Sequence, residues 1–499
     1  MGAPACGPGV APRNGSAQGS TRSRAERAQD PHRPRSSSVT VAPHRPARPT
    51  ARPGAQPAPG PPGPSAAADG PHPAIDRRLL VLLAFVGCAS PLAVDLYLAS
   101  FPAMARDLGT TPAMVRLTLT AYLVGVALGQ PLWGPVSQRH GRRATLVASG
   151  LAAVVASVLV VLAPTIELLV AARFLQAVAA SAGIVVARAM ISDLAHRYDG
   201  LRALATMMTI HGLVPVVGPV LGGALATALP WRAVLAVLAL VMASQLVVSL
   251  RWVPETLPSH RRSARVELGD LRRVVRRPAY LSAALVLGLA VATMMAFVAC
   301  SPFVYQELLG LSPLQYGLAG TVNALGMTVG GLVSVALARR RVHPSRTLAL
   351  TAPALVSATL LVLLAAASPW PGLLVLPALL SALCCSLLTT CSMGLAMEQA
   401  QDLPGAGSAM LGLFMFGVGA ALTPLAGLGS GPGGATVSAV PMGLLMTGCA
   451  VLLAAVVAVD ARRRRAGAWA DGFGSGPPEP VDAPPLTVSR TFSPQSLVN

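Results

Sequence analysis

The chain has 499 residues, of which 53% are hydrophobic and only 11% charged, and its mean hydropathy is +0.61. A globular protein carries about 25% charged residues, so this chain cannot cover the surface of a soluble domain of its size, and lipid must be its main solvent. The net charge of +19 comes from 38 arginines and no lysine. These arginines lie between apolar runs and have no interleaved aromatic residues, which argues against a nucleic-acid partner.

Residues 1–75 are rich in Pro, Ser and Arg and hold almost no large apolar side chain. Such a segment cannot bury enough surface to fold, and it lacks the apolar region of a signal peptide. We therefore expect a disordered, basic cytoplasmic tail. A misplaced start codon is the alternative explanation for this segment.

Twelve apolar runs of about 20 residues follow from Leu79 onward, and each is long enough to span ~30 Å of hydrocarbon. Their centres lie near Cys88, Leu123, Ala153, Ala180, Pro215, Val241, Ala290, Leu325, Ala358, Leu383, Phe416 and Gly448. Several connections are very short, so neighbouring helices must alternate in direction. The sequence therefore predicts an all-α integral membrane protein with twelve transmembrane helices.

Arginine is distributed unevenly between the loops. The loops after helices 2, 4, 6 and 8 hold sixteen arginines, whereas the loops on the other side hold three, Arg106, Arg116 and Arg232. The positive-inside rule then places both termini in the cytoplasm of a multi-pass protein of the inner membrane. The loop after helix 10 departs from this pattern, because it has Glu398 and Asp402 but no arginine.

The sequence also repeats at an offset near 200. Phe101-Pro102 corresponds to Ser301-Pro302, and Arg139 corresponds to Arg339. This offset predicts two six-helix halves in parallel orientation, an arrangement found in rocking transporters. The expected domains are the basic tail (1–75), an N-terminal six-helix bundle (76–253), a basic cytoplasmic linker (254–278), a C-terminal six-helix bundle (279–460) and a disordered cytoplasmic tail (461–499).

Five motifs follow one another in a characteristic order. They are Asp95–Pro102, Ala121–Gln130 with the basic turn Gly134–Arg143, Arg173–Asp193, Val217–Gly223 with Trp231-Arg232, and Ser301–Val304. Over about residues 79 to 460 the chain resembles the major facilitator superfamily, and within it the drug:proton antiporters of the bicyclomycin-resistance (Bcr/CflA) type. The resemblance implies the major facilitator fold and an efflux pump of the inner membrane that confers drug resistance.

Three residues are the candidates for proton coupling. Asp95 is the only acid well inside an apolar run, and desolvation there should favour its neutral form; a wetted, structural Asp near the interface is the alternative. Arg173 and Gln176 lie one helical turn apart and share a face. The resemblance links this arginine to proton transfer, with Asp95 as its expected partner, whereas a structural ion pair or snorkelling to the interface is the alternative.

The basic turn after helix 2 and the end of helix 4 are the candidates for gating. The predicted gating residues are Gly134, Gln138, Arg139, Gly141, Arg142, Arg143, Arg188 and Asp193. The resemblance implies that these charges latch the two halves, and solvated helix ends are the alternative. The sequence departs from the family at two positions. Gln138 replaces an acid, so that an amide must substitute in the latch, and Ala99 replaces a proline, which makes the expected bend in helix 1 uncertain.

Helix 5 carries small residues and prolines at spacings of three and four. These are Gly212, Pro215, Gly218, Pro219, Gly222 and Gly223. Small residues permit close helix contact and proline bends the helix, so plain packing is one interpretation. The resemblance adds that this antiporter motif limits the rocking of the two halves, so that exchange of compound for protons exceeds uncoupled leak.

The candidates for the substrate cavity are Tyr97, Tyr122, Gln130, Met294, Phe297 and Asn323. Met294, with Met295, Phe297 and Tyr305, is a candidate for an adaptable apolar wall, and ordinary packing is the alternative. For Asn323 the simplest expectation is a hydrogen bond between helices.

The predicted function is export of a small amphipathic compound or drug in exchange for protons, by a monomer that needs no cofactor beyond the proton gradient. A proton-coupled symporter is the alternative within transporters, and the helix 5 motif argues against it. A membrane-embedded transferase is the alternative among enzymes. We find no DDxxD, HxxxxD or Walker motif and no metal-ligand cluster, and the seven cysteines form no C-x-x-C pair, so no catalytic or metal site is predicted.

Overall fold

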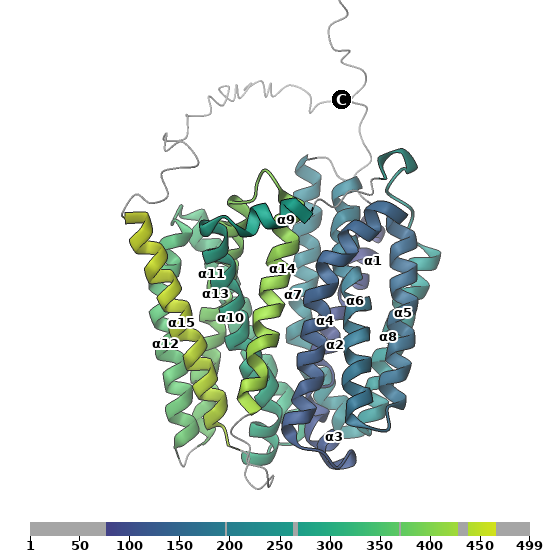
Figure 1. Ribbon diagram of the computed structural model, residues 1–499. Coiled ribbons are helices and arrows are strands. Elements are labelled where there is room, and N and C mark those ends of the chain that lie inside the picture. Colours follow the sequence, from purple (N-terminus) through teal and green to yellow (C-terminus); the bar gives the residue numbers. More distant parts are fainter. Residues whose placement is uncertain (1–75, 195–196, 263–267, 369–370, 428–437, 466–499) are drawn as a thin grey trace, which may run out of the picture. The chain divides into compact units, whose positions relative to one another are not determined.

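A computed structural model describes residues 76–194, 197–262, 268–368, 371–427 and 438–465, and every element within these ranges is a helix (Figure 1). The tail predicted for residues 1–75 and the tail beyond residue 465 lie outside the described residues. The predictions made for those tails therefore stay predictions.

The N-terminal half begins with a bent span. The helices of this half are α1 (Arg77–Gly87), α2 (Ala89–Asp95), the 3-10 turn η1 (Leu98–Ser100), α3 (Phe101–Asp107), α4 (Pro112–His140), α5 (Arg142–Leu162), α6 (Ile166–Leu194), α7 (Arg197–Ala228) and α8 (Trp231–Arg251). The chain bends by 43° between α1 and the segment Ala89–Asp107. Ala99 lies within η1, so the helix is irregular at this point without the proline that the family carries.

The C-terminal half follows two short elements, η2 (Ser259–Arg261) and α9 (Leu268–Val275). Its helices are α10 (Pro278–Phe303) with the π-helical turn η3 (Val304–Leu308), α11 (Pro313–Arg339), α12 (Pro344–Ala367), η4 (Pro371–Leu374), α13 (Val375–Glu398), α14 (Pro404–Leu422), η5 (Thr423–Gly427) and α15 (Val440–Arg465). Proline at the first position starts many of these helices, where its missing N–H costs nothing.

Within the described residues, eleven helices are long and apolar enough to cross a membrane, and the bent pair at the start makes twelve. This confirms the predicted all-α membrane fold. In the N-terminal half α4 and α5 pack on α6, and in the C-terminal half α13, α14 and α15 surround α10. The halves meet where α7 packs against α11 and α4 packs against α14. The central site lies beside the contact between α7 and α11.

Candidate functional site

A cavity of about 60 Å³ lies between the two halves. Its wall combines α2 and α7 of the N-terminal half with α10, η3 and α11 of the C-terminal half. The lining residues are Asp95, Leu98, Pro215, Pro219, Met294, Phe297, Val298, Ser301, Tyr305, Tyr316, Ala319, Gly320, Asn323, Ala324 and Met327. Asp95, a candidate for proton coupling, and Met294, Phe297 and Asn323, three of the candidates for the substrate cavity, therefore meet at one cavity.

Asp95 stands on α2 and its side chain lies against α7. A Cβ placed on Gly218 would come within 2.8 Å of the Asp95 Cβ, so this glycine makes room for the acid. Among the described residues the carboxylate has no hydrogen bond or ion pair, and it lines the cavity, half-buried. Asn323 presents a second unsatisfied group, because its Oδ1 is buried without a hydrogen-bond partner in the described part of the chain. The expected hydrogen bond from this side chain to another helix is therefore not formed at the oxygen.

Tyr316 is a polar cavity residue that the sequence analysis missed. Its hydroxyl lies 3.3 Å from the hydroxyl of Ser301, and its ring packs edge-on against that of Tyr305 with centroids 6.2 Å apart. Tyr305 itself belongs to the π-helical turn η3, an irregularity that is frequent at functional sites. A polar aromatic residue one turn into an apolar helix was the signal that could have identified Tyr316.

Arg173 on α6 is completely buried, with 0% of its surface exposed. One terminal nitrogen donates to Gln176 Oε1 at 2.6 Å, and the other donates to the carbonyl oxygen of Ala93 at 2.7 Å. The guanidinium carbon lies 3.9 Å from the ring centre of Tyr97 and 4.5 Å from that of Tyr122. Two ring faces and two hydrogen-bond acceptors thus stabilise this charge in a dry environment.

The expected contact between Arg173 and Asp95 is absent from this structure. Arg173 contacts the opposite side of α2 through the Ala93 carbonyl, two residues before the acid, whereas Asp95 faces α7. Tyr97 and Tyr122, predicted as cavity residues, instead lie fully buried against Arg173. Neither side chain lines this cavity: Tyr97, just before η1, and Tyr122, on α4, both pack on the guanidinium of Arg173.

Gln130, also predicted for the cavity, does not line it. Its side chain on α4 occupies the space beside Gly412 of α14, where any Cβ would overlap it. Gln130 therefore marks a close approach of the two halves.

Most of the helix 5 motif serves close packing. On α7, Gly218 faces Asp95 and Gly222 faces the Leu96 backbone. A Cβ on Gly223 would come within 2.5 Å of the Pro313 carbonyl oxygen in the other half. The two prolines of the motif line the cavity. Gly212 differs, because a Cβ there would meet nothing within 4 Å.

The basic turn between α4 and α5 is held by a carboxylate network within the N-terminal half. Arg142, only 4% exposed, donates from Nε to Asp193 Oδ2 at 2.9 Å and from a terminal nitrogen to Ser137 Oγ at 2.7 Å. Glu255 accepts from the backbone N–H of Arg142 at 2.9 Å and of Arg143 at 3.3 Å. The sequence analysis missed Glu255, which follows helix 6 and lies more than 110 residues away in the chain.

Gly141 makes this turn possible. Its φ of +96° is a conformation that side-chain-bearing residues rarely adopt. A Cβ there would also come within 2.5 Å of Glu255 Oε2. The turn and its acid therefore require glycine at this position.

The remaining predicted gating residues are placed differently. Gln138 and Arg139 are exposed and have no side-chain hydrogen bond in the described part of the molecule, so the Gln138 amide does not substitute for the missing acid in this conformation. Arg188 is half-buried, and its Nε lacks a partner among the described residues. A Cβ on Gly134 would meet nothing within 4 Å. The charged contacts of this turn join helices of one half and do not latch the two halves together.

Several contacts between the halves lie at the end of the bundle where α4 and α11 begin, which we call the arginine-poor end; the opposite end is the arginine-rich end. Phe101 and Phe303 lie with ring centroids 6.0 Å apart, Arg116 donates to Cys300 Sγ at 3.4 Å, and Gln306 donates to the Ala99 carbonyl at 3.0 Å. The irregular turn η1 frees that carbonyl for the contact. The arginine-poor end is therefore held together across the halves.

Comparison with known proteins gives a consistent result. The family model of the Major Facilitator Superfamily matches residues 83–424, more than half of the chain. An uncharacterized MFS-type transporter, YdgK, from Bacillus subtilis is 31% identical over 75% of this chain and 93% of its own length. The multidrug resistance protein MdtL from Escherichia coli is 29% identical over 53% of this chain and 67% of its own length.

Among solved structures, a bacterial homologue of the human lysosomal transporter Spinster, in an inward-facing and unoccupied conformation, superposes with a TM-score of 0.61. It covers 80% of this chain and 98% of its own, at 14% identity. At this identity the likeness concerns the fold alone. The match to the family model and the relative of 31% identity show that this chain is a multi-pass membrane transporter that belongs to the major facilitator superfamily.

Proposed function

We propose that this transporter is a drug:proton antiporter of the bicyclomycin-resistance type, which exports small amphipathic compounds. The observation that carries the proposal is Asp95, an acid without a polar partner among the described residues at a cavity built from both halves. The export direction is supported by similarity to a protein named for multidrug resistance.

The cavity has the chemistry that an amphipathic compound needs. Met294 and Phe297 supply polarizable, adaptable apolar surface, while Asp95, Tyr316 and Asn323 supply a few polar groups on the same wall. At about 60 Å³ it is smaller than the ~300–1,000 Å³ of a typical ligand site. Binding a drug-sized compound therefore requires the halves to separate around it, as alternating access demands.

Proton coupling at Asp95 follows from the cost of charge. A carboxylate in the membrane interior costs ~2.5–3.5 kcal/mol on insertion scales, so a closed, dry cavity favours the neutral acid. When the cavity opens to water, the acid can release its proton. Arg173 would act on this step through the backbone, because it holds the Ala93 carbonyl two residues away.

Alternating access requires one end to close while the other opens. We propose that the arginine-rich end faces the cytoplasm with both termini, in the inner membrane. The contacts at Phe101 and Phe303 would then close the outer end in this conformation. The Arg142–Asp193–Glu255 network would keep one half rigid during rocking, and Gln138 would find a partner only when the cytoplasmic end closes. We expect a monomer, driven by the proton gradient without a cofactor.

The rigid-half proposal predicts that Arg142→Gln slows transport at equal membrane abundance. The substitution removes the ion pair with Asp193 and leaves that carboxylate with only a Thr256 hydroxyl. Arg139→Gln makes the same charge change at an exposed arginine without a partner in the described residues, and it should leave the rate unchanged. Equal rates for the two variants would remove the network from the mechanism.

Everted membrane vesicles test the function directly. In vesicles with an acidic lumen, an exported compound should enter the lumen and drive protons out, which a fluorescent pH probe reports. Drugs to which the gene confers tolerance in a pump-deficient host are the compounds to use. A symporter would move protons inward with the compound, so the pH signal would have the opposite sign, and a protein that is not proton-coupled would give none.

A further inference from the structure

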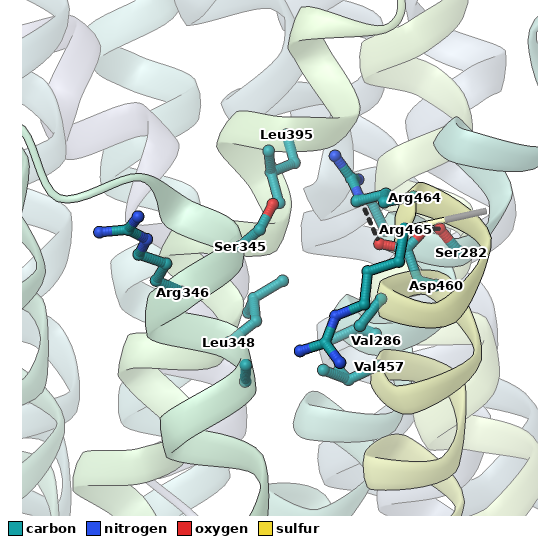
Figure 2. Close-up of a pocket in the computed structure, with 13 residues that line it drawn as sticks. Ser282, Val286, Ser345, Arg346, Leu348, Leu395, Val457, Asp460, Arg464 and Arg465 are labelled. Atoms are coloured by element: carbon teal, nitrogen blue, oxygen red, sulfur yellow. Dashed lines mark hydrogen bonds and ion pairs between the residues drawn. The ribbon is translucent and has the colours of Figure 1, made fainter. Parts of the chain in front are cut away.

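The C-terminal half contains a larger groove that shares no residue with the central cavity. It encloses about 420 Å³ between α10, α12, α13 and α15, and Figure 2 shows the side chains that line it. Buried apolar residues form its floor, among them Leu348 and Val457. At one end the lining becomes polar, with Arg346 on α12 and Arg464 and Arg465 on α15. The groove is therefore amphipathic along its length.

The polar end lies at the level of the helix ends. Arg346 is in the first turn of α12, which begins at Pro344, and Arg465 is the last residue of α15. Val457 lies eight residues earlier in α15, which is about 12 Å deeper at 1.5 Å per residue. Because these helices span the membrane, the helix ends that carry the arginines lie near the lipid headgroups, and the apolar floor at Val457 lies among the acyl chains.

Two of the three arginines are available to a ligand. The third, Arg464, is held by Asp460 at 2.7 Å, and the other oxygen of Asp460 accepts from the Ser282 hydroxyl at 3.1 Å. The side chains of Arg346 and Arg465 are exposed and have no ion pair or hydrogen bond within the described ranges. The hydroxyl of Ser345 is buried at the groove without a partner there. Three arginines and one aspartate leave a charge of +2 at this end.

We propose that the groove binds an anionic phospholipid carrying two phosphates, such as cardiolipin. The exposed side chains of Arg346 on α12, which Figure 2 shows turned outward from the groove, and of Arg465 on α15 turn to bind the phosphates. The Ser345 hydroxyl donates to a phosphate oxygen, and an acyl chain covers the apolar floor. The two negative charges of such a lipid match the +2 of the site, and basic pockets between membrane helices bind headgroups of this class. Figure 2 shows the Arg465 side chain extending back beside Val457.

The test uses the full-length protein in detergent and native mass spectrometry with tetraoleoyl cardiolipin. Arg346→Gln with Arg465→Gln should weaken cardiolipin binding about 30-fold, since each arginine charge near an anionic lipid contributes about 5-fold. The matched control is Arg462→Gln with Arg463→Gln, which removes two charges from the same helix end outside the groove and should weaken binding much less. Equal losses in the two double variants would overturn the proposal, because the attraction would then be nonspecific.

Three further tests separate the sources of binding. Leu348→Trp fills the apolar floor without changing charge and should weaken cardiolipin binding at least tenfold; unchanged binding would show that the groove holds no acyl chain. Inorganic phosphate at millimolar concentration should fail to displace the lipid, and displacement would indicate a simple anion site.

A chain ending at Gly467 should bind cardiolipin as the full chain does, whereas binding only after this truncation would show that the C-terminal segment occupies the groove.

Discussion

Arg173→Lys tests whether the buried guanidinium of Arg173, with its two separate hydrogen-bond acceptors, stabilises the N-terminal half. The guanidinium donates to Gln176 and to the Ala93 carbonyl while it lies against two tyrosine rings. A lysine ammonium is compact and cannot make this planar arrangement. Losing one hydrogen bond from a charged donor costs about 1.5–3 kcal/mol, and weaker stacking costs about 0.5–2 kcal/mol. We therefore expect Arg173→Lys to lower the free energy of unfolding by roughly 2–5 kcal/mol.

Equilibrium unfolding in mixed micelles of SDS and a nonionic detergent measures this change. Arg232→Lys is the matched control, because Arg232 also pairs with an acceptor, Asp107, and stacks on a ring, that of Trp231, but its side chain is 40% exposed. An exposed pair contributes about 0–1 kcal/mol. If both lysine variants lose the same small free energy, the buried cluster is not the stabilising element that its geometry indicates.

The remaining predictions concern the packing of α7 and the loop before α14. Gly218→Ala places a methyl group within 2.8 Å of the Asp95 Cβ and should slow proton-driven export severalfold in vesicles. Gly212→Ala is the control, because its methyl group would have no atom within 4 Å, and it should leave the export rate unchanged. Equal export rates for the two variants would refute the packing argument. The Arg277 guanidinium, through its hydrogen bonds to the carboxylate, lowers the pKa of Asp402 to about 2. A depressed pKa means that this pair stabilises the fold above about pH 4 and loses that effect as the pH falls through about 2. Carbon-13 NMR of the Asp402 carboxyl should report a pKa that returns toward its ordinary value in Arg277→Gln, and an unchanged pKa would remove the ion pair as its cause.

The twelve spans were predictable because a membrane requires about 20 apolar residues per helix, a constraint that composition alone reveals. The convergence of Asp95, Met294 and Phe297 was also within reach, because polar and polarizable residues in otherwise aliphatic spans are few. These predictions depend on local properties of the chain, and the structure brings the selected residues to one cavity.

The failures concern the direction of side chains. Tyr97 was assigned to the cavity, yet the irregular turn η1 follows it immediately and its ring packs on Arg173. No periodicity reports the irregular 3-10 turn at this point or the 43° bend earlier in the span. Glu255 was missed for another reason, since its contact with the basic turn joins residues far apart in the chain. Tertiary geometry of this kind is not encoded in any local pattern.

Asp95→Asn gives the most direct test of proton-coupled export. An Asn is nearly isosteric but cannot release a proton, so purified protein in proteoliposomes should still bind compound and exchange it downhill. It should fail to accumulate compound against its gradient when only a pH gradient is imposed. Glu167→Gln, at an exposed acid in the first turn of α6, is the control and should accumulate compound normally. Uphill accumulation at the wild-type rate by Asp95→Asn would contradict the account and move the proton site to another acid, with Glu307 the first to examine.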